Sequence, residues 1–175
     1  MGESNTEVET LLDSSLENQQ SSSENVNNDS QSYQKTKINV KHIFHGEINH
    51  NQKAVGFHHR NYIGYQGKAR VIDATVSNPD KNGVYRAKVE VFDIDKNRWI
   101  EKPCESSFFP DSWSIYKVYT EIKEAFNNRT YLHNKKWQGK SPSGIIISGY
   151  LDDNGDINTA YPKYSHNYKN ANKLI

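Results

Sequence analysis

The chain has 175 residues with a formal net charge of +1, and 34% of its residues are hydrophobic. This length suits one domain with room for a tail, and the low hydrophobic fraction indicates that part of the chain lies outside the core. No run of about 18 apolar residues is present, so we expect no membrane span, and no signal-peptide pattern opens the sequence. Because Cys104 is the only cysteine, neither an intramolecular disulfide nor a Cys-based zinc site is available.

Residues 1–37 are rich in Ser, Asn, Gln and Glu and contain only isolated apolar residues. We therefore expect a disordered polar and acidic tail or linker over 1–37 and one domain over 38–175. Residues 1–34 hold seven acidic and no basic residues; subtracting these from the totals of 22 basic and 21 acidic residues leaves 22 against 14, a net charge of +8 for 35–175. A basic domain is typical of proteins that bind polyanions such as nucleic acids.

Residues 41–60 contain five of the seven histidines. Imidazole takes and gives protons near neutral pH, so this segment can hold a metal, supply an acid–base pair or reflect composition alone. His42 and His45 with Glu47 would form a metal site on a helix, but Gly46 argues against a long helix and the HExxH spacing is absent. An acid–base pair requires only that two rings converge through the fold.

Three segments in the middle of the chain predict strands. Residues 71–76 (VIDATV) are mostly β-branched and end at an Asn-Pro-Asp turn. Alternate residues are apolar over 84–92, which predicts a half-buried strand. Residues 98–102 follow a turn at 95–97, so we expect them to pair back as an antiparallel hairpin.

The second half of the chain predicts a helix and another hairpin. Asp111 or Ser112 is a candidate cap for a helix whose apolar residues recur at helical spacing. These apolar residues are Ile115, Val118, Tyr119, Ile122 and Phe126. Residues 144–150 and 156–161 flank an Asp-Asp-Asn-Gly turn and predict a hairpin. Neither a βα alternation nor a glycine-rich phosphate loop occurs, so the expected fold class is α+β, an antiparallel β-sheet with packed helices.

Four segments of this region carry a set of motifs. Residues 42–48 read HIFHGEI, 55–58 read VGFH, 102–109 read KPCESSFF and 159–162 read TAYP. In this order they resemble the HxFxGE and GFH paired-histidine signature, the lysine segment and the closing TxYP motif of EndoU-type endoribonucleases. The resemblance extends over about residues 38–165 and implies an EndoU/RNase A-like catalytic domain.

The resemblance implies that His42, His58 and Lys102 are catalytic and that Thr159 and Tyr161 bind substrate. RNA supplies its own nucleophile, the 2′-hydroxyl, so cleavage needs a base, an acid and a cation near the phosphorus. By resemblance, His58 is the base and His42 the acid. The expected products are a 2′,3′-cyclic phosphate and a 5′-hydroxyl end, with no metal or other cofactor in the chemical step. Family members often prefer uridine, and toxin members can target transfer RNA.

The resemblance also implies a biological setting. In bacterial relatives such a domain is commonly the C-terminal toxin part of a larger secreted or contact-delivered protein, and a cognate immunity protein neutralises it. We therefore expect an antibacterial toxin domain that acts on single-stranded or transfer RNA after delivery into the cytoplasm of a target cell, with an immunity protein as its partner and no membrane span.

Several alternatives remain open at this point. We place His58 rather than its neighbour His59 in the site because it directly follows Gly-Phe, and in a strand the two side chains would face opposite ways. Other lysines that could replace Lys102 are Lys96, Lys117 and Lys140. Candidates for steering an RNA backbone are Arg60, Lys68, Arg70, Arg86 and Lys88.

Two other functions compete with the endoribonuclease. One is a metal-dependent phosphodiesterase that uses His42, His45 and Glu47. The other is a non-catalytic RNA-binding module with a degenerate site.

Overall fold

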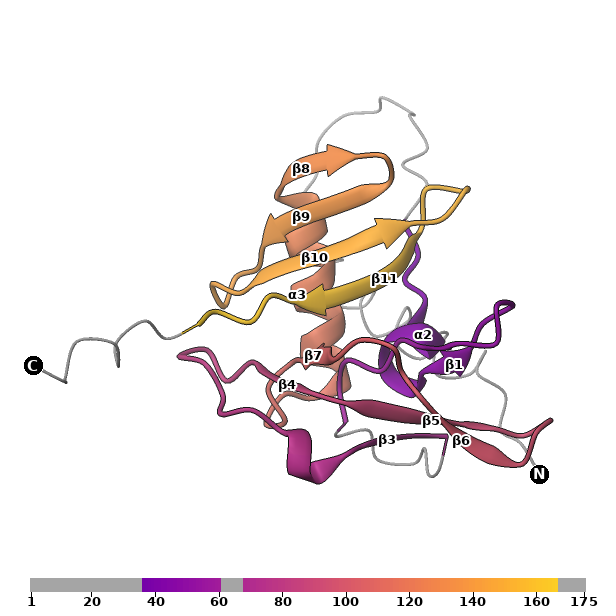
Figure 1. The fold of residues 1–175 in the computed structure, drawn as a ribbon. Coiled ribbons are helices and arrows are strands. Elements are labelled where there is room, and N and C mark those ends of the chain that lie inside the picture. The colour runs from indigo at the N-terminus through magenta and orange to yellow at the C-terminus, as the bar shows by residue number, and fades with distance from the viewer. Residues whose placement is uncertain (1–35, 61–67, 167–175) are drawn as a thin grey trace, which may run out of the picture. The chain divides into compact units, whose positions relative to one another are not determined.

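The computed structural model describes residues 36–60 and 68–166, which from Lys37 onward belong to one compact unit. The expected tail therefore lies, except for its last two residues, outside the described residues, and its order stays a prediction. Figure 1 labels the elements. In chain order they are α2 (Val40–His45), β1 (Glu47–Ile48), β2 (Ala54–Val55), β3 (Ala69–Val71), η1 (Asp73–Thr75), β4 (Tyr85–Ala87), β5 (Val89–Asp93), β6 (Arg98–Glu101), β7 (Ser106–Phe108), α3 (Ile115–Asn127), β8 (Arg129–His133), β9 (Lys136–Lys140), β10 (Ile146–Leu151) and β11 (Ile157–Pro162).

Four antiparallel strands form the larger sheet, in the order β11-β10-β9-β8, and α3 covers one of its faces (Figure 1). The edge of the Phe126 ring packs on Trp137 of β9, with the ring centroids 5.2 Å apart. Gly139 lets the helix approach closely, since a Cβ there would lie 1.8 Å from the Ala125 carbonyl oxygen. The apolar stripe predicted for α3 is confirmed, because four of its five residues are buried.

The remaining strands form a three-stranded sheet, β3-β5-β6, and two pairs, β4-β7 and β1-β2. The predicted hairpin of 84–92 with 98–102 is confirmed in β5 and β6, but the first strand is broken at Lys88. The alternation is kept across the break: Tyr85, Ala87, Val89 and Val91 are all buried in one core. The break arises because β4 pairs with β7, whereas β5 pairs with β3 and β6.

The expected strand over 71–76 is wrong beyond Val71. The chain turns there into η1, where the backbone N–H and the hydroxyl of Thr75 both donate to the Ile72 carbonyl, at 2.9 and 2.6 Å. The β-branched residues predicted a strand, but a Thr hydroxyl that bonds the local backbone favours a turn instead.

The start predicted for α3 is also wrong. The helix begins at Ile115 and is capped by Ser114, whose hydroxyl accepts the Lys117 N–H at 3.1 Å. Asp111 instead accepts the Tyr85 hydroxyl at 2.7 Å and pairs with Arg60. Asp111 thus makes contacts with distant residues instead of capping the helix as the local sequence predicted.

The hairpin of β10 and β11 is confirmed, with Ser148 opposite Tyr161 and Gly149 opposite Ala160. The β8-β9 hairpin was not predicted, because every residue of β8 is exposed and its side chains show no apolar alternation. The α+β class is confirmed: most described elements are antiparallel strands, with few helices. No helix in the described part of the chain is long and apolar enough to cross a bilayer.

The edge strand β11 joins the larger sheet to the rest of the domain. Asn39 donates its N–H to the Ile157 carbonyl at 2.9 Å, and Ile157 donates to the Lys37 carbonyl at 2.8 Å, so the chain before α2 pairs with the start of β11. β11 also lies beside α2 and β7 (Figure 1). Three segments far apart in the sequence therefore meet along this edge.

Candidate active site

A cleft of about 650 Å³ opens where these segments meet. Its walls come from α2, β2 and the residues after it, β4, β7 and the chain before it, and β11 and the chain after it. All five residues that the motifs singled out line it, namely His42, His58, Lys102, Thr159 and Tyr161. The fold thus brings together residues separated by up to 119 positions in the sequence.

Backbone hydrogen bonds fix the two histidine segments against each other. Phe57 donates its N–H to the His42 carbonyl at 2.9 Å, and His58 donates to the Ile43 carbonyl at 2.7 Å. Gly56 allows this approach, because its φ is +76° and a Cβ there would lie 2.1 Å from the His42 carbonyl oxygen. The glycine of the GFH motif is therefore required by packing as well as by backbone conformation.

His42 lies on α2, where the Asn39 side chain accepts its backbone N–H at 3.1 Å. Its Nδ1 is 3.0 Å from Oε1 of Glu47, which leaves Nε2 as the ring nitrogen available for proton transfer. The hydrogen bond from His42 is the main cause that lowers the pKa of the Glu47 carboxyl below its usual value. Glu47 is therefore an ionised carboxylate that orients the ring and faces it with a countercharge.

His58 has a different environment. It is 5% exposed, and its Nδ1 donates to the Ser107 carbonyl at 2.8 Å, which again leaves Nε2 free for chemistry. Burial, with a smaller effect from the Lys102 charge, lowers the pKa of His58 well below 6.5. The ring is therefore neutral near pH 7 and has a lone pair to accept a proton.

The neighbouring histidines do not line the cleft. His59 is fully buried with its ring edge-on to Phe44 at a centroid distance of 5.9 Å, and burial lowers its pKa. His45 is 4% exposed, and burial together with the charges of Lys41 and Lys68 lowers its pKa to about 4. His58 and His59 thus diverge as expected, although the chain is not a strand at this point.

Lys102 supplies the cation of the cleft. Its Nζ donates to the Ser106 hydroxyl at 2.6 Å and to the Gly56 carbonyl at 3.1 Å. Burial lowers the pKa of Lys102 from 10.5 to about 8, so the amine still carries its proton at neutral pH. The alternative lysines point elsewhere: Lys96 bonds Gln52, and Lys117 bonds Glu121.

Thr159 and Tyr161 occupy alternate positions of β11 and therefore share a face of the sheet. The Tyr161 ring lies 5.6 Å from the His58 ring, tilted by 32°. Burial raises the pKa of the Tyr161 phenol above 10, so this hydroxyl keeps its proton. The pair offers one hydroxyl and one aromatic face beside the two imidazoles.

Of the basic residues proposed to steer RNA, the structure brings only Arg86 to the cleft. Its Nη1 is 3.7 Å from Glu105, and its guanidinium lies 4.8 Å from the centre of the Tyr164 ring. Three of the others form ion pairs elsewhere: Arg60 with Asp111 at 2.7 Å, Arg70 with Glu90 at 2.7 Å and Lys88 with Glu101 at 3.0 Å.

Nine further residues line the cleft that the sequence did not single out as site residues. They are Val55, Gly56, Cys104, Glu105, Ser107, Pro162, Lys163, Tyr164 and His166. The first six lie inside the matched segments 55–58, 102–109 and 159–162, and the last three follow TAYP within four residues, so the motifs were a usable signal for them. His166 lines the cleft with its ring edge-on to Tyr164, at a centroid distance of 5.2 Å.

The residues of the competing metal site are not assembled. Within residues 36–60 and 68–166, no group of three His, Cys, Asp or Glu side chains is placed to hold a metal ion. His45, which that site requires, is buried in the core, while His42 and Glu47 are bonded to each other. The geometry gives no support to a site built from these three residues.

Two imidazoles, each anchored through Nδ1, together with a lysine ammonium on one cleft define a site for acid–base chemistry beside an anion. The model of the bacterial EndoU nuclease family matches residues 36–164, and the chain belongs to that family. The chain is also 40% identical over 125 residues to a Bacillus cereus protein named Toxin. That match covers 70% of this chain and 22% of the relative, so the chain spans a minor part of the relative's length. No solved structure matches the chain significantly.

Proposed function

We propose that this chain is a metal-independent endoribonuclease with an EndoU/RNase A-like architecture, which cleaves single-stranded RNA by attack of the 2′-hydroxyl on the adjacent phosphate. One observation carries the proposal: His42 and His58 face the same cleft with their Nδ1 atoms occupied, next to the Lys102 ammonium. This arrangement presents two Nε2 atoms and a positive charge to one phosphodiester.

The two environments suit different roles. His58 is neutral because it is buried near Lys102, so its Nε2 accepts the proton of the 2′-hydroxyl as that oxygen bonds to phosphorus. His42, whose ring is held through Nδ1 by the Glu47 carboxylate, acts as the acid with a proton on Nε2. His42 donates this proton to the 5′-oxygen as its bond to phosphorus breaks, leaving a 2′,3′-cyclic phosphate and a 5′-hydroxyl.

Lys102 stabilises the negative charge that develops on the phosphorane, since its ammonium is held in a partly buried site where charges interact strongly. Thr159 and Tyr161 bind the nucleotide, Thr159 through a hydrogen bond to the base and Tyr161 through stacking on a ribose or base. Arg86 contributes a second positive charge for the RNA backbone. Uridine at the cut and transfer RNA as the target are the preferences suggested by the family resemblance.

The name of the relative, Toxin, supports a role for this chain as the nuclease domain of a toxin. The chain corresponds to about a fifth of that protein, in keeping with the nuclease part of a longer toxin. We infer that the domain is delivered into a target cell, acts on RNA there, and is inhibited by a cognate immunity protein in the producing cell.

The test is cleavage of a labelled single-stranded RNA by the full chain, with and without EDTA. His42→Ala and His58→Ala should each lower the rate by about 10²–10⁴-fold with an unchanged melting temperature. His50→Ala is the matched control, because His50 is exposed in the β1-β2 turn and does not line the cleft.

The products and the substrate provide independent checks. Cleavage should leave a 2′,3′-cyclic phosphate, and one 2′-deoxy substitution at the cut should block it. Inhibition by EDTA with a linear phosphate product would support the metal-dependent alternative. Binding of RNA without cleavage would support the non-catalytic alternative.

A further inference from the structure

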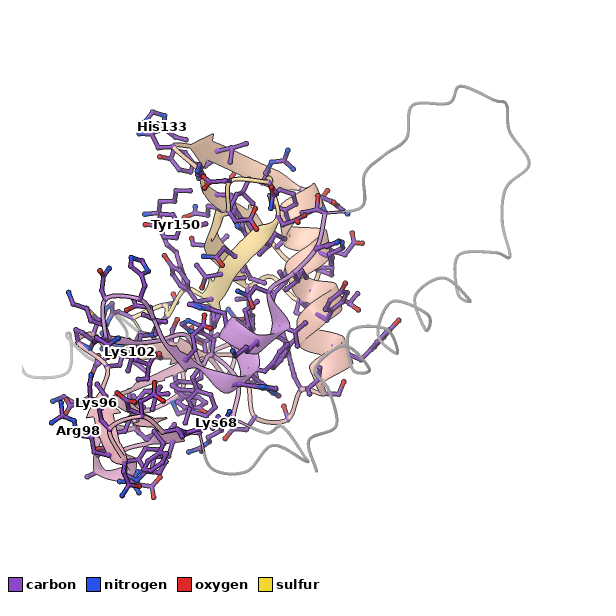
Figure 2. The ribbon with its side chains drawn as sticks, turned by 90° about the vertical axis from the view of Figure 1, so that its right-hand side faces the viewer. Lys68, Lys96, Arg98, Lys102, His133 and Tyr150 are labelled. Atoms are coloured by element: carbon purple, nitrogen blue, oxygen red, sulfur yellow. The ribbon has the colours of Figure 1, made fainter. Side chains whose placement is uncertain are left out.

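The face of the larger sheet opposite α3 has a composition that the catalytic cleft does not explain. Tyr150 is 42% exposed and Tyr131 is 45% exposed, although large aromatic side chains are costly to leave in water. Figure 2 shows Tyr150 and His133 on the side of the sheet away from α3, the side on which Lys102 also lies. We define the open face by two rows of side chains that cross the strands from β11 to β8.

The first row begins at Thr159 in the cleft. The strand register places Tyr150 opposite Thr159, Lys136 opposite Tyr150, and His133 opposite Lys136. Lys136 Nζ lies 5.9 Å from the centre of the Tyr150 ring. This row therefore runs outward from a proposed substrate-binding residue through an aromatic ring, a cation and an imidazole.

The second row begins at Tyr161 and runs parallel to the first. Ser148 is opposite Tyr161, Gln138 is opposite Ser148, and Tyr131 is opposite Gln138. The Ser148 hydroxyl donates to Gln138 Oε1 at 3.3 Å. The row ends in an exposed ring, so stackable groups stand at both of its ends.

The open face is electrically suited to an RNA backbone. Neither row contains a carboxylate, and β9 contributes Lys136 within the first row and the exposed Lys140 on the same face of the strand. Tyr150 and His133 of the first row and Tyr131 of the second are exposed, whereas Ser148 is buried. Lys135 in the β8-β9 turn pairs with Asp153, so its charge is already matched. The rows are also continuous with the cleft, because Thr159 and Tyr161, the first residues of the two rows, both line it.

The geometry points to an RNA platform: the open face extends the catalytic cleft and binds the nucleotides that flank the cut, with Tyr150 and Tyr131 stacking on bases and Lys136 contacting phosphate. This inference rests on the proposed function, and it adds a position for the nucleotides on either side of the cut. The platform crosses three strand spacings, about 14 Å, which is room for several stacked nucleotides. Aromatic and cationic side chains on an open antiparallel sheet are a common means of binding single-stranded nucleic acid.

The test compares a dinucleotide with a 12-nucleotide single strand as substrates of the full chain. The variants are Tyr150→Ala, Tyr131→Ala and Lys136→Ala. Each should lower kcat/KM for the 12-mer by about 5- to 100-fold and change kcat/KM for the dinucleotide by less than about twofold, because stacking and phosphate contacts beyond the cut exist only with the longer RNA.

The matched controls lie on the other side of the sheet. The first control is Leu132→Ala. Leu132 is exposed and follows Tyr131, but it pairs with Trp137 and therefore lies on the opposite face of β8. The second control, Lys123→Ala, removes a cation from α3. Both controls should leave the two activities unchanged. Melting temperatures of all variants should stay near that of the unsubstituted chain, since the substituted side chains lie at the surface.

Binding of a fluorescent, fully 2′-O-methylated 12-mer, measured by anisotropy, separates this inference from the proposed function. If the unsubstituted chain cleaves neither RNA, the proposed function fails, and the anisotropy series still tests the platform. If the unsubstituted chain cleaves the dinucleotide and the 12-mer, and the three variants match the controls in cleavage and binding, the open face does not bind RNA and the inference is wrong.

Discussion

Replacing Lys102 by methionine should abolish cleavage and at the same time stabilise the fold. Lys102 is partly buried in the cleft, and burial lowers its pKa from 10.5 to about 8. At about 1.4 kcal/mol per pH unit, this lowering corresponds to about 3 kcal/mol by which folding disfavours the charged ammonium. Methionine has a similar shape and no charge, so the variant avoids that cost.

The stability gained by the Lys102→Met variant should shrink as the pH rises. The folded state has the lower pKa, so between about 8 and 10.5 the unfolded state holds a proton that the folded state has lost, and the native chain gains stability as the pH rises. The advantage of the Lys102→Met variant should therefore be at most about 3 kcal/mol at pH 7 and about 1.5 kcal/mol at pH 9.5. Loss of the ammonium hydrogen bonds to Ser106 and Gly56 reduces both values by about 1 kcal/mol.

Urea unfolding of both proteins at the two pH values measures this difference. Lys81→Met, at an exposed turn position, is the control and should change the free energy of unfolding by less than about 0.5 kcal/mol at either pH. A Lys102→Met variant that is less stable than the native chain at pH 7, by an amount independent of pH, would refute the idea that the cleft holds Lys102 at a cost.

Three other changes probe the same site. Glu47→Gln should lower kcat by at least about tenfold with little change in KM, because it removes the countercharge of His42 without removing the ring; an unchanged kcat would show that Glu47 has no such role. Gly56→Ala should lower the free energy of unfolding by about 2 kcal/mol or more, seen as a lower melting temperature, because its Cβ would lie 2.1 Å from a carbonyl oxygen at φ +76°. The value of kcat/KM should persist to well below pH 6.5, where His58 is still neutral, and should have fallen by the time the pH rises through about 8, where Lys102 loses its proton. Lys102→Arg should move that alkaline fall upward; a fall that stays in place would assign it to another group.

Much of the fold could be read from local patterns. The β10-β11 hairpin, the β5-β6 hairpin and the apolar stripe of α3 follow from alternation, turn residues and helical spacing. Two errors occur where a distant partner decides: Asp111 bonds Tyr85 instead of capping a helix, and the strand over 84–92 divides because its two halves pair with different strands. The third is local, because the Thr75 hydroxyl bonds the Ile72 carbonyl and turns the chain where a strand was expected. β8 was missed because none of its residues is buried.

The motifs named five site residues before any geometry was known, and the structure places all five on one cleft. Their functional roles remain predictions, as does the state of residues 1–35. The motifs did not predict which basic residues would surround these five in the structure. Nothing in the sequence alone showed that Arg86 would reach the cleft while Arg60 and Arg70 were engaged in ion pairs.

The sequence by itself determined which side chains are candidates for the chemistry, because residue type and motif order are properties of the chain. Only the tertiary structure decided how these side chains are oriented and what surrounds each of them. His42 and His58 are the same side chain, but one faces a carboxylate and the other is buried beside an ammonium. Burial, hydrogen bonding and neighbouring charge set the behaviour of an imidazole, and all three depend on residues brought together from distant parts of the chain.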